Sequence, residues 1–309
     1  MSSEKITCLL NWQATPYHVP VFLAQKLELF QKHGIKVAIL EPSDPSDVTE
    51  IIGSGKSDLG LKAMIHTIAA KANGFNVTSI GTLLDEPLTG VIHVKTQSGI
   101  TDFESLRGKK IGYVGHFGKV IIDELMRSRG FQETDYTAVR VGMNVTDAIK
   151  RGVIDAGVGL ENVQQAELEN WVESKGQPRS DVEMLRIDEL ADLGCCCFCS
   201  VLYIGNDEFI EKNPEKVKAF MAAIRESTNY MLANPDKAYA LFTEMKPALA
   251  TKDHRTIYDR SMIYFSKDQS NVQRDWNKVT GYSKRLGLVN DTFVQNMTNE
   301  FIQLDTVDR

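Results

Sequence analysis

A lysine and a histidine four residues apart are the first candidates for chemistry in this sequence. The segment Gly60-Leu61-Lys62-Ala63-Met64-Ile65-His66 follows an expected strand end and is predicted to open a helix that runs to Asn73-Gly74. That helix would place Lys62 and His66 on one face. A lysine shielded from water at a strand end can form a Schiff base with an aldehyde. The alternative is a solvated surface lysine beside a packing histidine, since most lysines are exposed.

A glycine-rich turn supplies the second candidate, Gly115-His116-Phe117-Gly118-Lys119. It lies between an expected strand at 110–114 and an expected helix from about 119 to 129. Free N–H groups and the helix dipole attract phosphate at such a position, and glycines allow close approach. The segment lacks the longer spacing and the Lys-Ser/Thr ending of a Walker A loop. An ordinary tight turn between strand and helix is the alternative.

Four of the five cysteines form the third candidate, Cys195-Cys196-Cys197-Phe198-Cys199. Neighbouring cysteines fit disulfide geometry poorly, so we expect free thiols in a reducing compartment. In a strand, Cys195, Cys197 and Cys199 would face one side and Cys196 the other. Thiolates bind soft or borderline metals, and iron is possible; the spacing differs from the usual zinc pairs. Core packing is the alternative, but the density of cysteines favours a functional role.

The loop after the first expected strand contains residues that could contact a planar ring. Asn11, Trp12, Tyr17 and His18 lie there, and aromatic side chains can stack on such a ring. Packing at a hinge is the alternative. Glu41, at the end of the second expected strand, is either a ligand-facing carboxylate or a charge on the rim.

A diverged internal repeat provides the elements that must position these residues. Each copy predicts a strand, a turn, a helix, a glycine stop and a second strand entered through x-Asp-x-Gly. Two such units argue for two similar α/β lobes. The first copy contains a strand at 6–10, a helix from about 20 to 33, and Asp47–Ile52 followed by Gly55, Asp58 and Gly60; the second contains the strand and helix named above, and Asn144–Ile149 followed by Gly152, Asp155 and Gly157.

The chain is expected to pass between the lobes twice. Val91–Val94 leads out of the first lobe and Cys199–Ile204 leads back. The region after Asp207 is mostly helical, including a helix from Pro214 to Ala233 that ends at Asn234-Pro235. We therefore predict a periplasmic-binding-protein-like (type II) α/β fold with a double crossover and a ligand cleft between lobes. Residues 1–92 and 204–309 would form lobe one, and residues 93–203 lobe two.

Composition narrows the functional classes. The 309 residues are 42% hydrophobic and 25% charged, and the net charge is −6. An acidic chain without a basic patch predicts no nucleic-acid or anionic-membrane partner. No apolar run approaches the roughly 20 residues that span a bilayer. Residues 1–5 lack the features of a signal peptide, so a cytoplasmic location is expected.

Together these residues resemble a known family. The sequence is similar to the fungal 4-amino-5-hydroxymethyl-2-methylpyrimidine phosphate synthases of thiamine biosynthesis over nearly its whole length. The resemblance is carried by Leu10-Asn11-Trp12 with Thr15-Pro16-Tyr17-His18, by residues 60–66, by the turn at 115–119 and by the cysteine cluster.

The resemblance implies roles that spacing alone does not give. Lys62 would bind pyridoxal 5′-phosphate as a Schiff base, and His66 would give ring atoms to the pyrimidine, so that the protein is a substrate and turns over once. Iron and oxygen would drive the oxidative steps, and family members are usually homodimers. Phosphate and ring contacts would come from Gly115, His116, Phe117, Gly118, Lys119, Asn11, Trp12 and Tyr17; iron contacts would come from Cys195, Cys196, Cys197, Cys199 and His66.

Two other readings remain open. A non-catalytic binding protein of the same fold, carrying a thiamine precursor or a related ring, would explain the repeat and the double crossover. An ordinary multiple-turnover pyridoxal phosphate enzyme would use His66 only as a base. The binding protein would not explain the Lys62 and His66 pair beside the cysteine cluster, and equal amounts of product and enzyme would argue against the multiple-turnover enzyme.

Overall fold

The computed structural model describes residues 5–194 and 196–302, and the chain divides into two compact units. Unit 1 contains residues up to 43, residues 47–85 and residues from 200 onward, whereas unit 2 contains residues 44–46 and 86–199. The chain thus passes from unit 1 to unit 2 and back, as the double crossover predicted. Among the described residues, no helix combines the length and apolar character that crossing a membrane requires.

In unit 1 the described strands form a five-stranded sheet in the order β2-β1-β3-β10-β4. Strand β1 runs parallel to β2 and β3, whereas β10 is antiparallel to β3 and β4. The strands of this sheet are β1 (Ile6–Leu9), β2 (Val37–Leu40), β3 (Leu59–Ala63), β4 (Val77–Leu84) and β10 (Val201–Asn206).

Unit 2 repeats this arrangement with the order β7-β6-β8-β5-β9. Strand β6 runs parallel to β7 and β8, and β5 is antiparallel to β8 and β9. The fourth strand of each sheet, β10 in unit 1 and β5 in unit 2, is the first strand after the chain crosses into that unit. The strands are β5 (Thr89–Val94), β6 (Lys110–Tyr113), β7 (Thr137–Arg140), β8 (Ala156–Leu160) and β9 (Val182–Arg186).

This pairing corrects the predicted lobe boundaries. All of β5 belongs to unit 2 because it pairs with β8 and β9, although the sequence places residues 89–92 in lobe one. All of β10 belongs to unit 1 because it pairs with β3 and β4, although the sequence places residues 201–203 in lobe two. Apart from residues 44–46, the units change at 85/86 and 199/200.

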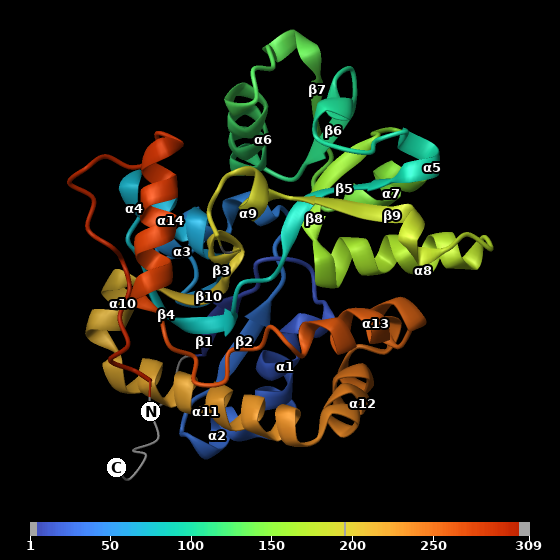
Figure 1. Ribbon diagram of the computed structural model, residues 1–309. Helices are drawn as coiled ribbons and strands as arrows, with labels where there is room; N and C mark the ends of the chain where they lie inside the picture. Colours follow the sequence, from blue (N-terminus) through green and yellow to red (C-terminus); the bar gives the residue numbers. More distant parts are fainter. Residues whose placement is uncertain (1–4, 195, 303–309) are drawn as a thin grey trace, which may run out of the picture. The chain divides into compact units, whose positions relative to one another are not determined.

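The helices of unit 1 surround its sheet, and most come from the C-terminal third of the chain (Figure 1). Helix α11 packs against α1 and α2, and α12 packs against α1, which confirms that the late helices return to the first lobe. The unit 1 helices are α1 (Val19–Lys26), α2 (Leu29–Lys32), α3 (Val48–Gly53), α4 (Met64–Ala72), α10 (Asp207–Lys212), α11 (Pro214–Ala233), α12 (Pro235–Met245), α13 (Lys252–Ser261) and α14 (Gln273–Arg285); those of unit 2 are α5 (Lys95–Ser98), α6 (His116–Ser128), α7 (Val145–Lys150), α8 (Ala166–Ser174) and α9 (Ile187–Leu190).

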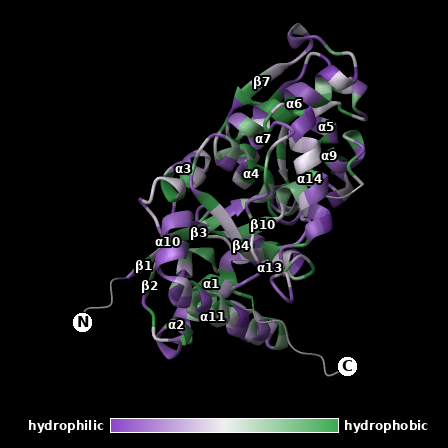
Figure 2. Cartoon of the chain, turned by 90° about the vertical axis from the view of Figure 1, so that its left-hand side faces the viewer, coloured by the Kyte–Doolittle hydropathy of each residue, from purple (hydrophilic) through white to green (hydrophobic). Residues whose placement is uncertain are grey.

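Helix α11 has the bounds that its sequence predicted. Proline at its first position costs no hydrogen bond, and buried Val217, Phe220 and Ile224 recur at helical spacing. Hydrophilic and hydrophobic residues accordingly share this helix (Figure 2). Phe220 stacks on Phe30 of α2 with ring centroids 5.6 Å apart, so the helix closes the core of unit 1. Asn234-Pro235 ends α11, and α12 begins at once.

The predicted helix from about residue 20 to 33 is wrong as a single element. Helix α1 ends at Lys26, and Glu28 adopts a left-handed backbone (φ 57°) before α2 begins. A non-glycine residue in that region interrupts a right-handed helix.

An aspartate latch recurs in both copies of the repeat. Asp58 Oδ2 accepts from the backbone N–H of Thr7 at 2.7 Å and from its hydroxyl at 2.8 Å. Asp155 Oδ2 accepts from the backbone N–H of Lys110 at 2.7 Å. Each latch joins the residue before the second strand to the first strand, so the x-Asp-x-Gly motif has the same structural role in both units.

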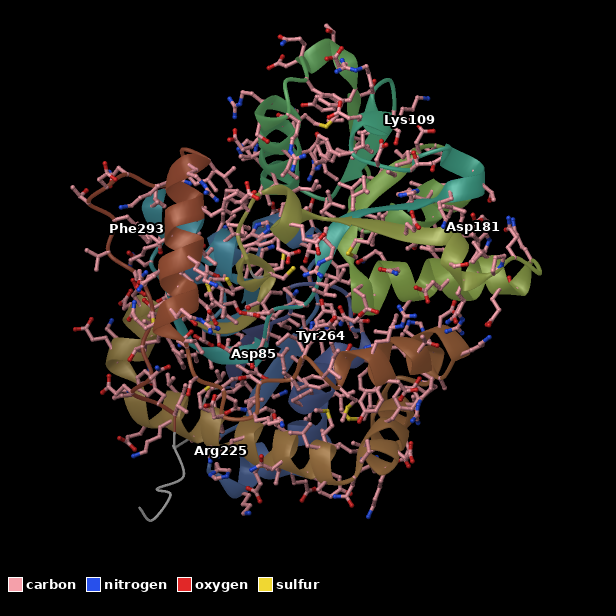
Figure 3. All side chains as sticks on the ribbon, in the orientation of Figure 1. Asp85, Lys109, Asp181, Arg225, Tyr264 and Phe293 are labelled. Atoms are coloured by element: carbon pink, nitrogen blue, oxygen red, sulfur yellow. The ribbon has the colours of Figure 1, made fainter. Side chains whose placement is uncertain are left out.

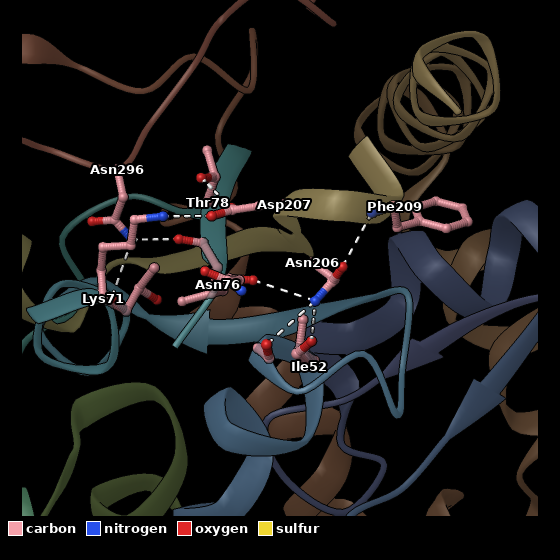
Figure 4. Close-up of polar contacts among 11 residues, drawn as sticks. Ile52, Lys71, Asn76, Thr78, Asn206, Asp207, Phe209 and Asn296 are labelled. Atoms are coloured by element: carbon pink, nitrogen blue, oxygen red, sulfur yellow. Dashed lines mark hydrogen bonds and ion pairs between the residues drawn. The ribbon is translucent and has the colours of Figure 1, made fainter. Parts of the chain in front are cut away.

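Polar side chains also hold the turn from β10 to α10, as Figure 4 shows. Asn206 donates to the carbonyl oxygen of Ile52 at 3.0 Å and accepts from Phe209 N–H at 3.1 Å. Asp207 pairs with Lys71 of α4 and accepts from the Thr78 hydroxyl at 2.7 Å. These contacts fix β10, the neighbour of β3, within unit 1.

The last strand before the crossover is held by a later segment of the same unit. Asp85 N–H donates to the carbonyl oxygen of Tyr264 at 2.7 Å, and Figure 3 labels both residues. Leu84 forms an antiparallel bridge with Phe265. The crossover therefore leaves from a fixed point of unit 1.

Candidate functional site

Lys62 lies on β3, inside the sheet of unit 1. It pairs in register with Leu202 of β10, and it is 5% exposed. Two residues earlier, a Cβ atom on Gly60 would lie 2.4 Å from the carbonyl oxygen of Leu9, so glycine permits β1 and β3 to approach closely at this point. The sequence thus buries a primary amine at the end of a strand, which is the setting that Schiff-base chemistry uses.

His66 lies in the first turn of α4, which begins at Met64. Burial lowers the pKa of His66 well below its usual value, and the neighbouring charge of Lys62 lowers it further. The imidazole is therefore neutral at physiological pH.

The prediction that Lys62 and His66 share one helix face is wrong. Residues 59–63 pair with β10, and Ala63 keeps an extended backbone (φ −66°, ψ 145°) before the helix starts. The two residues are neighbours because a strand passes directly into a helix, and their electrostatic coupling reflects this proximity.

The loop after β1 forms a compact buried structure. Pro16–His18 is a short 3-10 helix, and Tyr17 and His18 are 3% and 0% exposed. Asn11 bonds both of them: its Nδ2 donates to the Tyr17 hydroxyl at 3.1 Å, and its Oδ1 lies 2.9 Å from His18 Nε2. Trp12 is partly exposed. The structure thus groups three predicted ring-contact residues, Asn11, Trp12 and Tyr17, in one ordered turn.

Glu41 anchors this loop from the end of β2. Its Oε2 accepts from Ala14 N–H at 2.7 Å, and its Oε1 pairs with Lys246 Nζ at 2.6 Å. These contacts lower the pKa of Glu41, despite the opposing effect of its partial burial. The carboxylate therefore has a structural partner at each oxygen, which accounts for its position without a ligand.

The glycine-rich turn of unit 2 is the start of a helix. Gly115 caps α6, and His116, Phe117 and Gly118 occupy its first turn, so the prediction that this helix begins near Lys119 is wrong by about one turn. Its first N–H groups lack partners within the helix and can bind an anion. Lys119 pairs with Asp123, which raises the pKa of Lys119.

Ser46 is the residue at this helix end that sequence reasoning missed. A Cβ atom on Gly115 would lie 2.5 Å from Ser46 Oγ, so only glycine leaves space here. Among the described residues, Ser46 Oγ is a buried oxygen without a hydrogen-bond partner. A phosphate oxygen suits such a hydroxyl. Ser46 lies in the 3-10 helix Pro45–Asp47, and nothing in the sequence around it signals its contact with Gly115.

The cysteine segment is not a strand. Cys197–Cys199 forms a short 3-10 helix, so the predicted alternation of sulfurs across a strand is wrong; Cys195 lies outside the described residues. The expectation of free thiols holds for Cys196 and Cys199, whereas Cys197 is disulfide-bonded. A metal can bind the Cys197 sulfur only after reduction, because the ligand is the thiolate.

Asp188 is a second residue that the sequence did not single out. Its side chain hydrogen-bonds the Cys196 thiol and is held by Arg186 through contacts of 3.1 and 2.6 Å. Burial raises the pKa of Cys196 beyond its usual range, and it raises that of Cys199 to about 12. Without a metal, both thiols are therefore protonated at neutral pH.

Two five-stranded sheets of the same topology, together with the double crossover, define a class of protein. Solved structures of low sequence identity share the fold. The alkanesulfonate-binding protein SsuA from Xanthomonas axonopodis pv. citri matches with a TM-score of 0.70 and 12% identity, and the match covers 93% of this chain and 94% of that chain. A Candida albicans protein described as having the generic periplasmic binding protein fold matches with a TM-score of 0.71, 14% identity and 97% and 98% coverage. The fold is therefore periplasmic-binding-protein-like, as predicted.

Sequence comparison narrows the class to a family. Residues 15–238 match the family model described as NMT1/THI5 like. The 4-amino-5-hydroxymethyl-2-methylpyrimidine phosphate synthase of Aspergillus parasiticus is 61% identical over 98% of this chain and 88% of its own length. The synthase of the same name from Uromyces fabae is 59% identical over 98% and 89%, and that of Schizosaccharomyces pombe 56% over 98% and 87%. The chain belongs to the NMT1/THI5-like family, which confirms the resemblance drawn from its motifs.

Proposed function

We propose that this protein synthesises 4-amino-5-hydroxymethyl-2-methylpyrimidine phosphate for thiamine biosynthesis, with pyridoxal 5′-phosphate and its own His66 as substrates. The observation that carries the proposal is the buried amine of Lys62 beside the neutral imidazole of His66. The relatives that share 56–61% identity bear the name of this synthase, which supports the same product.

The side chains present suit an aldehyde-bearing phosphate ester. In unit 1, Lys62 offers a nucleophilic amine for the aldehyde, and Asn11, Trp12 and Tyr17 offer polar and aromatic contacts to a ring. In unit 2, the N-terminus of α6 and the unpaired Ser46 hydroxyl suit a phosphate. The proposal thus assigns the aldehyde to Lys62 and the phosphate to the N-terminus of α6.

The proposal includes iron because of the kinds of ligand atom that the chain offers. Cysteine sulfur and imidazole nitrogen are both ligands that iron accepts. We assign the iron to Cys195, Cys196, Cys197, Cys199 and His66, and it would supply one-electron chemistry with oxygen. Because the described thiols are protonated and Cys197 is oxidised, binding of iron at neutral pH requires prior reduction and releases protons.

Peptide mass spectrometry tests the proposal most directly. The pure reduced protein is incubated with pyridoxal phosphate, ferrous iron and oxygen, and its peptides are compared with the untreated chain. We expect a mass loss confined to the His66 peptide, matched one-for-one by pyrimidine phosphate. Several product molecules per chain with an unchanged His66 would instead establish a conventional multiple-turnover enzyme. Bound pyridoxal phosphate without any product would establish a binding protein, which is the function of SsuA-type neighbours of this fold.

Two variants separate substrate binding from consumption of the histidine. Borohydride reduction should fix the pyridoxyl group on the Lys62 peptide of the wild type and of His66→Asn, because the amine is intact in both. It should not do so in Lys62→Arg. A pyridoxyl group retained by Lys62→Arg would show that another amine binds the aldehyde, and full product formation by His66→Asn would remove the histidine from the reaction.

The family resemblance also leads us to propose a homodimer. Sedimentation equilibrium at micromolar concentration should give twice the monomer mass of 34.5 kDa. A single-chain mass across that range would refute this part of the proposal.

A further inference from the structure

The loop after β1 contains a continuous chain of hydrogen bonds that runs through His18. The backbone N–H of Thr15 donates to His18 Nδ1 at 3.2 Å. His18 Nε2 lies 2.9 Å from Asn11 Oδ1, and Asn11 Nδ2 donates to the Tyr17 hydroxyl at 3.1 Å. The His18 ring is 0% exposed and lies 4.2 Å from the Tyr17 ring, centroid to centroid.

One fixed donor determines the tautomer of His18. A backbone N–H can only donate, so Nδ1 must be unprotonated. Burial lowers the pKa of His18 to about 3, which leaves the ring neutral at physiological pH with its single proton on Nε2. His18 at the third position of the turn thereby takes the place of the glutamate or glutamine of a capping box, which accepts from the same backbone N–H.

The tautomer then determines the orientation of Asn11. A protonated Nε2 requires an acceptor, so the amide oxygen must face His18 and the NH2 group must face Tyr17. The Tyr17 oxygen accepts that bond and keeps its own hydroxyl proton. Burial raises the pKa of Tyr17 above its usual value, so the phenol stays protonated. Asn11 and Tyr17 each keep one proton that they can donate to a further group.

We propose that His18 is a positioning residue that makes Asn11 and Tyr17 hydrogen-bond donors toward the substrate ring. The backbone N–H of Thr15 fixes the tautomer of His18, and this tautomer fixes the direction of the hydrogen bonds from His18 to Asn11 and from Asn11 to Tyr17. The loop therefore selects aromatic rings that present acceptor atoms, such as an oxyanion or an unprotonated ring nitrogen, over rings that present N–H or O–H groups. This inference rests on the proposed function, in which Asn11 and Tyr17 contact the ring of pyridoxal phosphate.

Nitrogen NMR of histidine-labelled protein tests the tautomer without any ligand. Two-bond nitrogen–proton spectra should show His18 neutral, with its proton on Nε2, from about pH 5 to 8. A proton on Nδ1, or a ring that titrates within this range, would overturn the inference.

Binding of pyridoxal phosphate, followed by its absorbance, tests the effect on the substrate. His18→Gln keeps a group that accepts from Thr15 and donates to Asn11, so its Kd should stay within about threefold of the wild type. His18→Leu removes both contacts and frees the amide to reorient, and it should weaken binding by about tenfold, the usual effect of one lost hydrogen bond. Thermal denaturation is measured on both variants, because a purely structural role would lower the melting temperature of the leucine variant and leave its Kd unchanged.

A second variant keeps the test decisive if His18→Leu does not fold. Asn11→Asp keeps the shape of the side chain and the acceptor for His18, but it has no proton for Tyr17 or the ring, and it should weaken binding at least tenfold. Binding by Asn11→Asp equal to the wild type would overturn the inference while leaving the proposed function intact. Failure of the wild type itself to bind pyridoxal phosphate would overturn the proposed function, and this inference with it.

Discussion

The burial of His18 predicts a specific acid sensitivity of unit 1. The pKa of His18 is about 3 in the folded protein and about 6.5 in an unfolded chain. Below pH 6.5 the unfolded state therefore binds a proton that the folded state does not, and the stability falls as the pH falls. For this one group the linkage relation gives a cost of about 0.4 kcal/mol at pH 6.5 and about 1.4 kcal/mol at pH 5.5. The expected loss over that unit of pH is about 1 kcal/mol.

The variant His18→Gln isolates this contribution, because glutamine does not titrate. Trp171 lies in unit 2, so in a Trp171→Phe background the fluorescence of Trp12 and Trp276 reports unit 1 alone during urea unfolding. At pH 8 histidine is neutral in both the folded and the unfolded state. The unfolding free energies of the His18 chain and the His18→Gln variant therefore differ there only through the contacts that the substitution removes. That difference should shrink by about 1 kcal/mol between pH 6.5 and 5.5. A difference that stays constant would mean that the ring is protonated in the folded state, and it would refute the tautomer argument.

Three further predictions concern the framework around the site. Asp58→Asn should destabilise unit 1 by about 2 kcal/mol and Asp155→Asn should destabilise unit 2 by about 1 kcal/mol, since Asp58 accepts one hydrogen bond more. Hydrogen exchange of the β1 and β6 peptides measures both effects. Loss of protection in the unit that does not contain the substitution would contradict the prediction. Gly60→Ala should lower the melting temperature by several degrees, because its Cβ would meet a backbone oxygen at 2.4 Å, whereas Gly281→Ala, a helical position with open space, should raise the unfolding free energy by up to about 1 kcal/mol. Glu41→Gln should weaken pyridoxal phosphate binding a few-fold through the loop that it anchors, most strongly at low salt, and an unchanged Kd would limit Glu41 to a role in stability.

Local sequence patterns predicted the parts of the fold that depend on local physics. Helix α11 was bounded correctly because proline, apolar spacing and an Asn-Pro break all lie within it. The repeat was visible because the Asp58 and Asp155 latches need the same residue at the same place in each copy. The order of elements then predicted the fold class.

The errors at the site arose where distant partners decide the local structure. The sequence places Lys62 in a helix because glycine precedes it and a helix follows, but the antiparallel pairing with β10, from far along the chain, keeps it in a strand. Cys197–Cys199 has the residues of a buried strand, yet it turns because the chain must re-enter unit 1 at Ser200. The contact of Ser46 with Gly115 and the bond of Asp188 to the Cys196 thiol arise from folding, and no spacing in the sequence indicates them.

Comparison of the two copies shows which of them contains the residues of the proposed covalent chemistry. Register places Gly60 and Gly157 at equivalent positions in their sheets, so the counterparts of Lys62 and His66 are Gly159 and Val163. A Cβ atom at position 159 would lie 2.8 Å from the Gln164 side chain and 2.9 Å from Ile92, so unit 2 has no space for a lysine there. The amine and the imidazole therefore belong to one copy, on a sheet whose twin keeps the same strands without them. Under the proposed function, two positions at one strand end distinguish the reactive copy from its counterpart, and the helix N-terminus of the other copy suits an anion.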